Sequence, residues 1–182
     1  MSDPSGQPAP GAGVSIRAAR PDDAETVAPL VRDIFIETFG PSNKPENIDA
    51  YVREAFAVEH VRAELEDPST IALVADVDGQ AAGFARMETG AAPEGIAGAS
   101  PVELVRLYVR ATYHGTGVAA TLMQACIDAA KARGCDVMWL GVWEHNPRAQ
   151  AFYRKWGFER AGEHVFQLGD EAQTDFLFQR PL

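Results

Sequence analysis

The feature that most constrains this chain is a glycine turn between an apolar segment and a helical segment. Residues 103–109 (ELVRLYV) are rich in β-forming side chains and lead, through residues 110–113, into the turn at 114–119 (HGTGVA). Helix-forming residues follow over 120–133. A helix that begins at a glycine turn presents unpaired backbone N–H groups and the positive end of its dipole to that turn. This arrangement favours a bound anion, most naturally a phosphate.

Taken alone, the turn is also compatible with an ordinary turn that holds no ligand. Its glycines match neither the dinucleotide fingerprint G-x-G-x-x-G nor a Walker A loop, because no Lys-Ser or Lys-Thr pair follows. A second pattern lies downstream at residues 146–158 (NPRAQAFYRKWGF). Its Asn146-Pro147 pair is typical of a helix cap followed by proline at the first helical position.

The chain predicts one domain over residues 14–182. Residues 1–13 (MSDPSGQPAPGAG) contain mainly Pro, Gly, Ser and Ala, and we expect them to form a disordered leader. The remaining length is sufficient for a sizeable core. Hydrophobic periodicity predicts helices at 21–38, 45–56, 58–66, 120–133 and 147–156, and strands at 14–18, 70–77, 80–88, 101–110, 136–144, 158–168 and 172–179.

Two positions within these elements predict local backbone features. Pro29 is expected to interrupt or kink the first helix. Asp78-Gly79 predicts a two-residue turn that joins two strands into a hairpin. The order of strands and helices predicts an α/β protein, with a mixed sheet and helices on both of its faces.

Charge and composition exclude several classes of function. The net charge of −10 argues against non-specific binding to nucleic acid or to an anionic membrane. It is compatible with a cationic substrate, or with solubility alone. Cys126 and Cys135 show no metal-ligand spacing, and no apolar run approaches the roughly 20 residues of a membrane span. A cytoplasmic protein is the simplest expectation.

No metal site is expected from the histidines. None of the four is spaced as a metal ligand, and we interpret them as scattered, solvated side chains. They are His60, His114, His145 and His164.

The two motifs together carry a family resemblance. His114-x-x-Gly117-x-Ala119 resembles the pyrophosphate loop Q/R-x-x-G-x-G/A of the GNAT superfamily of N-acetyltransferases, and residues 146–158 resemble its second motif, N-x-x-A-x-x-x-Y-x-x-x-G-F. The resemblance implies a mixed, mostly antiparallel sheet of about seven strands, splayed between the fourth and fifth strands. It also implies acetyl-CoA as the acetyl donor, coenzyme A as a product, and no metal.

The same resemblance implies cofactor contacts. The backbone groups of Leu107, Tyr108 and Val109 are expected to pair with the pantetheine arm of the cofactor. The pyrophosphate is expected to be wrapped by His114, Gly115, Thr116, Gly117, Val118 and Ala119. His114 departs from the family pattern, which has Arg or Gln there. Asn146 is expected to cap its helix, and by resemblance to contact the cofactor arm.

Three catalytic roles are expected. By resemblance, Tyr153 is the general acid that protonates the coenzyme A thiolate; its alternative role is that of a core aromatic residue. Glu103 could accept the proton of an amine acceptor, or it could be a surface glutamate paired with Arg106 or another cation. The N–H of Val109 is the expected oxyanion donor. Cys126 lies on the apolar face of its helix and is expected to pack there, which favours direct transfer over a cysteinyl intermediate.

A further resemblance restricts the chemical class of the amine acceptor. Residues 103–109, 140–146 and 162–175 resemble the bacterial spermidine/spermine (Pai-type) branch, as do residues 35–51. A polyamine or another small cationic amine is the resulting prediction. Glu37 and Tyr51 could hold it through charge and a ring face; alternatively, Glu37 is simply exposed and Tyr51 packs. A protein N-terminus or lysine, an aminoglycoside, or a non-catalytic acetyl-CoA-binding module remain alternatives, and a homodimer is compatible with this fold.

Overall fold

The computed structural model describes residues 13–182, and the expected leader therefore lies almost entirely outside the described residues. The helices are α1 (Ala24–Phe39), α2 (Pro45–Ala55), α3 (Val58–Glu66), α4 (Val118–Ala132) and α5 (Pro147–Lys155). The strands are β1 (Val14–Ala18), β2 (Thr70–Val77), β3 (Gln80–Thr89), β4 (Pro101–Val109), β5 (Val137–Trp143), β6 (Glu159–Leu168) and β7 (Glu171–Pro181). Within the described range, no helix is both long and apolar enough to cross a membrane.

The described strands form one seven-stranded sheet in the order β1-β2-β3-β4-β5-β7-β6. Neighbouring strands are antiparallel except β4 and β5, which are parallel. The β4–β5 ladder covers only the pairs Pro101↔Val137, Val102↔Met138 and Glu103↔Trp139. Beyond these pairs, residues 104–109 of β4 and 140–143 of β5 separate. The predicted fold class, including the splay between the fourth and fifth strands, is confirmed.

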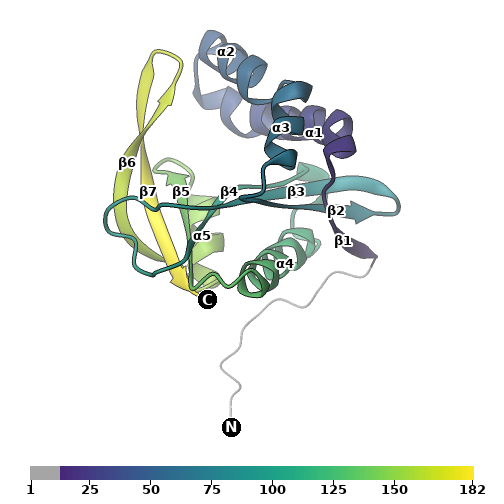
Figure 1. The fold of residues 1–182 in the computed structure, drawn as a ribbon. Coiled ribbons are helices and arrows are strands. Elements are labelled where there is room, and N and C mark those ends of the chain that lie inside the picture. The colour runs from purple at the N-terminus through teal and green to yellow at the C-terminus, as the bar shows by residue number, and fades with distance from the viewer. Residues whose placement is uncertain (1–12) are drawn as a thin grey trace.

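Apolar cores lie on both faces of the sheet. Helices α1, α2 and α3 cover one face, and α4 and α5 lie against the other (Figure 1). The α1 core residues include Leu30, Val31 and Phe35, all nearly inaccessible to solvent. On the opposite face, Leu122 and Cys126 of α4 are completely buried. The prediction that Cys126 packs is therefore confirmed.

Local sequence signals fix several element boundaries. Asp78 and Gly79 have φ angles of 51° and 77°, as a type I′ hairpin turn requires.

The first helix differs from its prediction in two ways. Residues 21–23 form a 3-10 turn, and α1 itself begins at Ala24. The helix also continues through Pro29, although the sequence predicted an interruption there. The helix tolerates this proline because its buried residues on either side, Val27 to Phe35, remain anchored in the core.

A bulge in β4 determines which side chains share a face. Arg86 of β3 pairs with Arg106 and the next residue, Met87, pairs with Leu104, so Val105 has no partner. The alternation of side chains therefore reverses at Val105. Leu104 and Leu107 consequently both face α4. Arg106 faces α3, as its contact with Glu64 shows.

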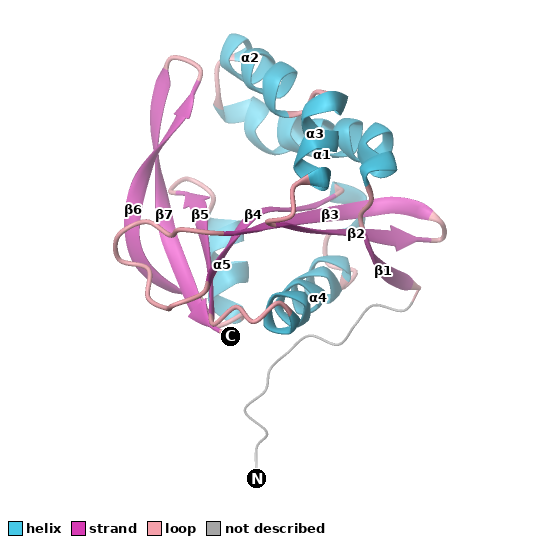
Figure 2. Cartoon of the chain, in the orientation of Figure 1, coloured by secondary structure: helices cyan, strands magenta, loops and turns pink. Residues whose placement is uncertain are grey.

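The long connection between β3 and β4 crosses β5 and β7 (Figure 2). Asp136, directly before β5, accepts hydrogen bonds from the N–H groups of Ala99 and Ser100 at 2.7 and 2.9 Å. The N–H of Ala97 donates to the side chain of Gln179 on β7. These contacts hold the start of β4 beside β5, where the two strands are paired.

A buried ion network joins α3 to the sheet. Glu64 of α3 lies 2.6 Å from a guanidinium nitrogen of Arg106 and 3.3 Å from one of Arg86. The side chains of Glu64, Arg86 and Arg106 are only 12%, 10% and 7% exposed. Glu64 is thus the carboxylate that pairs with Arg106, and it shares Arg86 with the half-exposed Glu88 of β3, which lies 2.8 Å from Arg86.

We predict that Glu64→Ala lowers the free energy of unfolding by about 3 kcal/mol, because it leaves Arg106 buried without its anion and leaves Arg86 with Glu88 alone. Urea unfolding followed by circular dichroism measures the loss. Glu66→Ala removes an exposed carboxylate from the same helix and should cost less than about 0.5 kcal/mol. Equal costs for the two variants would show that the network contributes nothing specific.

Candidate active site

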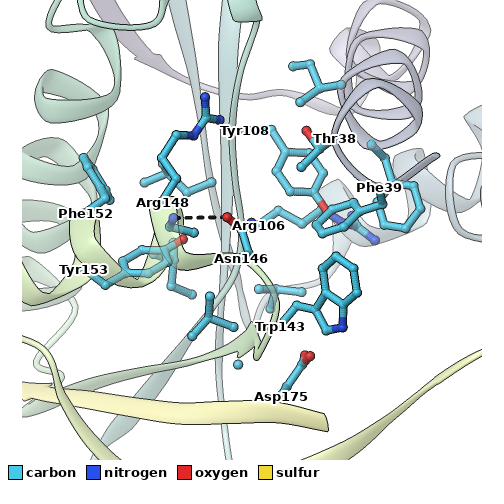
Figure 3. A pocket seen from close by; sticks show the side chains of 18 of the residues that line it. Thr38, Phe39, Arg106, Tyr108, Trp143, Asn146, Arg148, Phe152, Tyr153 and Asp175 are labelled. Atoms are coloured by element: carbon cyan, nitrogen blue, oxygen red, sulfur yellow. Dashed lines mark hydrogen bonds between the residues drawn. The ribbon is translucent and has the colours of Figure 1, made fainter. Parts of the chain in front are cut away.

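The separation of β4 from β5 opens a cavity of about 440 Å³ that passes through the sheet. Residues 103–109 of β4 form one wall, and Gly141 to Trp143 of β5 form the wall opposite. Tyr153 and Phe152 of α5 line the cavity on the side of α4, and Phe35 and Phe39 of α1 line it on the other side. Figure 3 shows Tyr153 across the cavity from Tyr108, Phe39 and Trp143.

The glycine turn presents backbone donors to one end of this cavity. Gly117, the residue before α4, has a φ of 92°, which favours glycine. Within residues 13–182, no side chain caps this helix end, so the N–H groups of its first turn lack intrahelical partners. Gly115 also has a positive φ, and the space that its Cβ would occupy is open. The turn thus has the donors and the room to bind phosphate oxygens.

The backbone of β4 also offers groups to the cavity. The N–H of Arg110 donates to the carbonyl of Ala82 at 2.9 Å. Hydrogen-bonded and non-hydrogen-bonded pairs alternate in an antiparallel ladder, so the pair Gly83↔Val109 is a non-hydrogen-bonded one. The N–H of Val109 therefore points away from β3 and towards β5. Leu107, two residues earlier on the regular part of the strand, is turned the same way.

The same geometry contradicts the prediction that backbone groups of Tyr108 pair with the pantetheine arm. Its backbone belongs to the hydrogen-bonded pair with Phe84, and its carbonyl oxygen lies close to Gly83 of β3. Its backbone groups are therefore turned away from the gap. The phenol ring lines the cavity instead. Burial and the neighbouring Tyr51 raise the pKa of this phenol, so it stays protonated at neutral pH.

His114 links the turn to α5. Its Nε2 lies 2.9 Å from the carbonyl oxygen of Val109, and its Nδ1 lies 2.9 Å from a guanidinium nitrogen of Arg148. A neutral imidazole protonated at Nε2 satisfies both contacts, since it donates to the carbonyl and accepts from the guanidinium. His114 thereby holds the cation of Arg148 beside the turn. No local sequence pattern predicted this role of Arg148, because the contact spans 34 positions.

Asn146 caps α5, as predicted. Its side-chain oxygen accepts a hydrogen bond from the N–H of Ala149 at 3.1 Å, and Pro147 occupies the first helical position. Asn146 and Ala149 both line the cavity. The cap therefore fixes the start of the helix that carries Tyr153.

Tyr153 is held between aromatic neighbours. Its ring centroid lies 5.5 Å from that of Phe152 and 5.6 Å from that of Phe158. Burial, together with the nearby Cys126, raises the pKa of the Tyr153 phenol. Burial also raises the pKa of the Cys126 thiol to about 12. Both groups are therefore protonated at neutral pH, and the cysteine has little thiolate to act as a nucleophile.

Glu103 faces the cavity and does not pair with Arg106, whose partner is Glu64. The pKa of Glu103 is raised, first by burial and then by Glu88 opposite it on β3, while Arg86 lowers it. Glu103 lies at the closed end of the gap, where β4 and β5 are still paired.

An aromatic chamber occupies the α1–α2 side of the cavity. We use this term for the rings of Phe35, Phe39, Tyr51, Trp143 and Phe166, which all line it. Tyr51 stacks on Phe35 with ring centroids 4.8 Å apart and meets Phe166 edge-on at 5.7 Å. Tyr51 thus both packs and lines the chamber. Glu37 is exposed and lines a neighbouring recess near His145, outside the chamber.

Contacts beside the chamber join the start of α2 to the β6–β7 hairpin, which rises beside α2 (Figure 1). The amide of Asn47 donates to the carboxylate of Asp170 at 2.7 Å, and Gln173 donates to the side-chain oxygen of Asn43. Lys44 lies 3.0 Å from Glu171. We call this set of contacts the clasp. It bridges segments more than 120 residues apart in the sequence.

Sequence reasoning also missed a pair of titratable groups in the cavity. His164 of β6 and Asp175 of β7 are register partners, and Nε2 and Oδ2 lie 3.7 Å apart. The His164 side chain is 39% exposed, as the interpretation of a solvated histidine expects in part, but its Nε2 is buried. Only the register of the last hairpin brings the two residues together. Among residues 13–182, no three His, Cys, Asp or Glu side chains are grouped as metal ligands.

Comparisons with known proteins assign the family. Residues 28–158 match the family model described as "Acetyltransferase (GNAT) family". The chain is 31% identical to an uncharacterised N-acetyltransferase of Lactobacillus delbrueckii subsp. lactis, over 93% of this chain and 98% of the relative. It is 34% identical to an uncharacterised N-acetyltransferase of Mycobacterium tuberculosis, over 88% and 98% of the two chains. The chain therefore belongs to the GNAT family of acetyltransferases.

The fold has matching solved structures. One is the PaiA N-acetyltransferase of Thermoplasma acidophilum in complex with coenzyme A, with a TM-score of 0.73 and 22% identity over 93% of this chain and 99% of the other. This likeness concerns the fold.

We predict that Asn146→Ala lowers the free energy of unfolding by about 1 kcal/mol, because the N–H of Ala149 loses its cap. Asn146→Asp keeps a capping oxygen and should restore most of the stability. Chemical denaturation of the two variants and the wild type measures the difference. A stable alanine variant would show that the cap is dispensable.

Proposed function

We propose that this acetyltransferase moves the acetyl group of acetyl-CoA to a primary amine of a small cationic acceptor, with a polyamine as the first choice. The observation that carries the proposal is the aromatic chamber. It is joined through the β4–β5 gap to the side of the sheet that holds Tyr153. An acceptor in the chamber can thus meet a donor in the gap.

The residues around the gap suit acetyl-CoA. The outward-facing backbone groups of Leu107 and Val109 would pair with the pantetheine arm as a further strand does. The N–H groups of residues 114–119 would hold the pyrophosphate, and Arg148 adds a positive charge beside them. Asn146 would contact the arm. The cofactor supplies the acetyl group as a thioester, and coenzyme A is the product.

The chain's own groups can carry the proton transfers. The N–H of Val109 points into the gap and would donate to the oxyanion that develops from the thioester carbonyl. Tyr153 keeps its proton at neutral pH and can give it to the departing thiolate. Glu103 is the carboxylate that the sequence predicted to accept the amine proton, directly or through water. The buried, protonated Cys126 favours direct transfer in a ternary complex.

The chamber favours a small cation. Ring faces attract ammonium groups, and the carboxylates of Glu103 and Asp175 add negative charge. Arg106 also lines the chamber, but Glu64 neutralises it at 2.6 Å. The clasp joins α2 to the β6–β7 hairpin beside the chamber and so limits its width. A small amine is therefore favoured over a protein N-terminus or an internal lysine.

The proposal predicts thiol release from acetyl-CoA in the presence of spermidine or spermine. A screen with a thiol reagent should compare these polyamines with amino acids, aminoglycosides and short N-terminal peptides. Turnover with polyamines at least 10-fold above that with peptides is expected. Activity confined to peptides or aminoglycosides would reject the polyamine. Coenzyme A binding without release for any amine would support a non-catalytic module.

We further predict that Tyr153→Phe lowers kcat about 100-fold, because the ring remains but its proton is lost. The KM for acetyl-CoA should change less than about 2-fold, since the aromatic contacts with Phe152 and Phe158 are retained. Steady-state kinetics and calorimetric titration with coenzyme A measure the two effects. Wild-type turnover in this variant would remove Tyr153 from the mechanism.

A further inference from the structure

His164 and Asp175 converge on Gly141. A Cβ at Gly141 would lie 2.9 Å from Nε2 of His164 and 3.3 Å from Oδ2 of Asp175. The two polar atoms therefore occupy the space of the missing side chain. Gly141 lies two residues beyond Trp139, the last residue of β5 that pairs with β4. The pair is thus placed where the strands have separated, at the level of the gap.

The contacts of His164 are incomplete. Its Nε2 is buried and has no hydrogen-bond partner among the described residues. The distance of 3.7 Å to Asp175 is too long for a hydrogen bond. His164 lines the cavity and its side chain is 39% exposed, and a ring nitrogen without a partner has the capacity to bind a ligand N–H group. Figure 3 shows Asp175 extending from β7 towards the same space.

We propose that Nε2 of His164 accepts the proton of the acceptor ammonium group and that Asp175 stabilises the resulting imidazolium. This inference rests on the proposed function and assigns the proton-accepting group of that reaction. The ammonium N–H bond breaks, and its electron pair stays on nitrogen and attacks the thioester carbonyl carbon. The C–S bond breaks, and the sulfur takes the proton of Tyr153. The second proton of the attacking nitrogen returns to the Tyr153 phenolate, so the products are a neutral amide, the coenzyme A thiol and the His164 imidazolium. In this assignment Glu103 does not accept the proton but contributes negative charge to the chamber.

The surroundings of the pair suit this role. Asp175 is only 16% exposed, and burial raises its pKa, while His164 lowers it. A positive charge on the imidazole therefore stabilises the carboxylate. Two other titratable groups act on Asp175: the phenol of Tyr108 from β4, and Glu144 after the end of β5. Glu103 lies instead beside Glu88, at the closed end of the gap.

The test is the pH dependence of kcat/KM for spermidine in wild type, His164→Gln, Asp175→Asn and Glu103→Gln. We expect His164→Gln to lower kcat about 100-fold at pH 7 and to flatten the acidic limb of the profile, with the KM for acetyl-CoA within about 2-fold. Asp175→Asn should move that limb to lower pH, since the imidazolium loses its charged neighbour. Glu163→Gln, an exposed neighbour paired with Arg160, is the matched control.

Several outcomes overturn the inference. If the acidic limb of the kcat/KM profile is intact in His164→Gln, the inference fails. It also fails if that limb is lost only in Glu103→Gln. Either result makes Glu103 the group that accepts the ammonium proton. Free imidazole should restore part of the rate of His164→Ala, and an absence of rescue together with normal coenzyme A binding indicates a merely structural role.

The outcome for the proposed function is separate. If wild type binds coenzyme A but releases no thiol with spermidine, the polyamine proposal fails. Nuclear magnetic resonance of the histidine side chains then decides on His164 without turnover. The inference requires that the amine for which the screen detects thiol release shifts the titration of His164 in wild type and does so less in Asp175→Asn. A His164 signal unaffected by that amine overturns the inference.

Discussion

The separation of β4 from β5 after three residue pairs is the constraint on which the rest of this site depends. Each strand is held on its outer side: β4 by β3 as far as Gly83↔Val109, and β5 by β7 along its whole length. The backbone groups that face the gap are therefore free to pair with a ligand. A backbone group removed from water has to find such a partner, so the break in the sheet favours an extended polar chain between the strands.

The two ends of this gap differ in charge. At the glycine turn, His114 holds the cation of Arg148 beside free N–H groups, which suits an anion. In the chamber, Glu64 cancels the charge of Arg106, whereas Glu103 has no ion pair of its own in the described residues. One end of the cavity thus carries a cation and free N–H groups, and the other carries a carboxylate without an ion pair in the described residues. This polarity follows from contacts between distant segments.

Much of the fold and part of the site could be predicted from the sequence. The Asp78-Gly79 turn, the Asn146 cap and the glycine turn before α4 act over a few residues, and each residue type has the backbone preference that its position requires. The bulge at Val105 could not be predicted, because a bulge depends on pairing with β3. That bulge decides that Glu103 and Arg106 share a face and so turns Glu103 towards the chamber.

By itself, the sequence determined the order of the elements, the two motifs and the phenol of Tyr153, because local backbone preferences and hydrophobic periodicity are written in neighbouring residues. The tertiary structure alone decided which charges meet. The partner of Arg106 is Glu64, 42 residues away, and His164 faces Asp175 only through the register of the last hairpin. Such pairings depend on strand register and helix packing, which place side chains together across distances that no local pattern encodes.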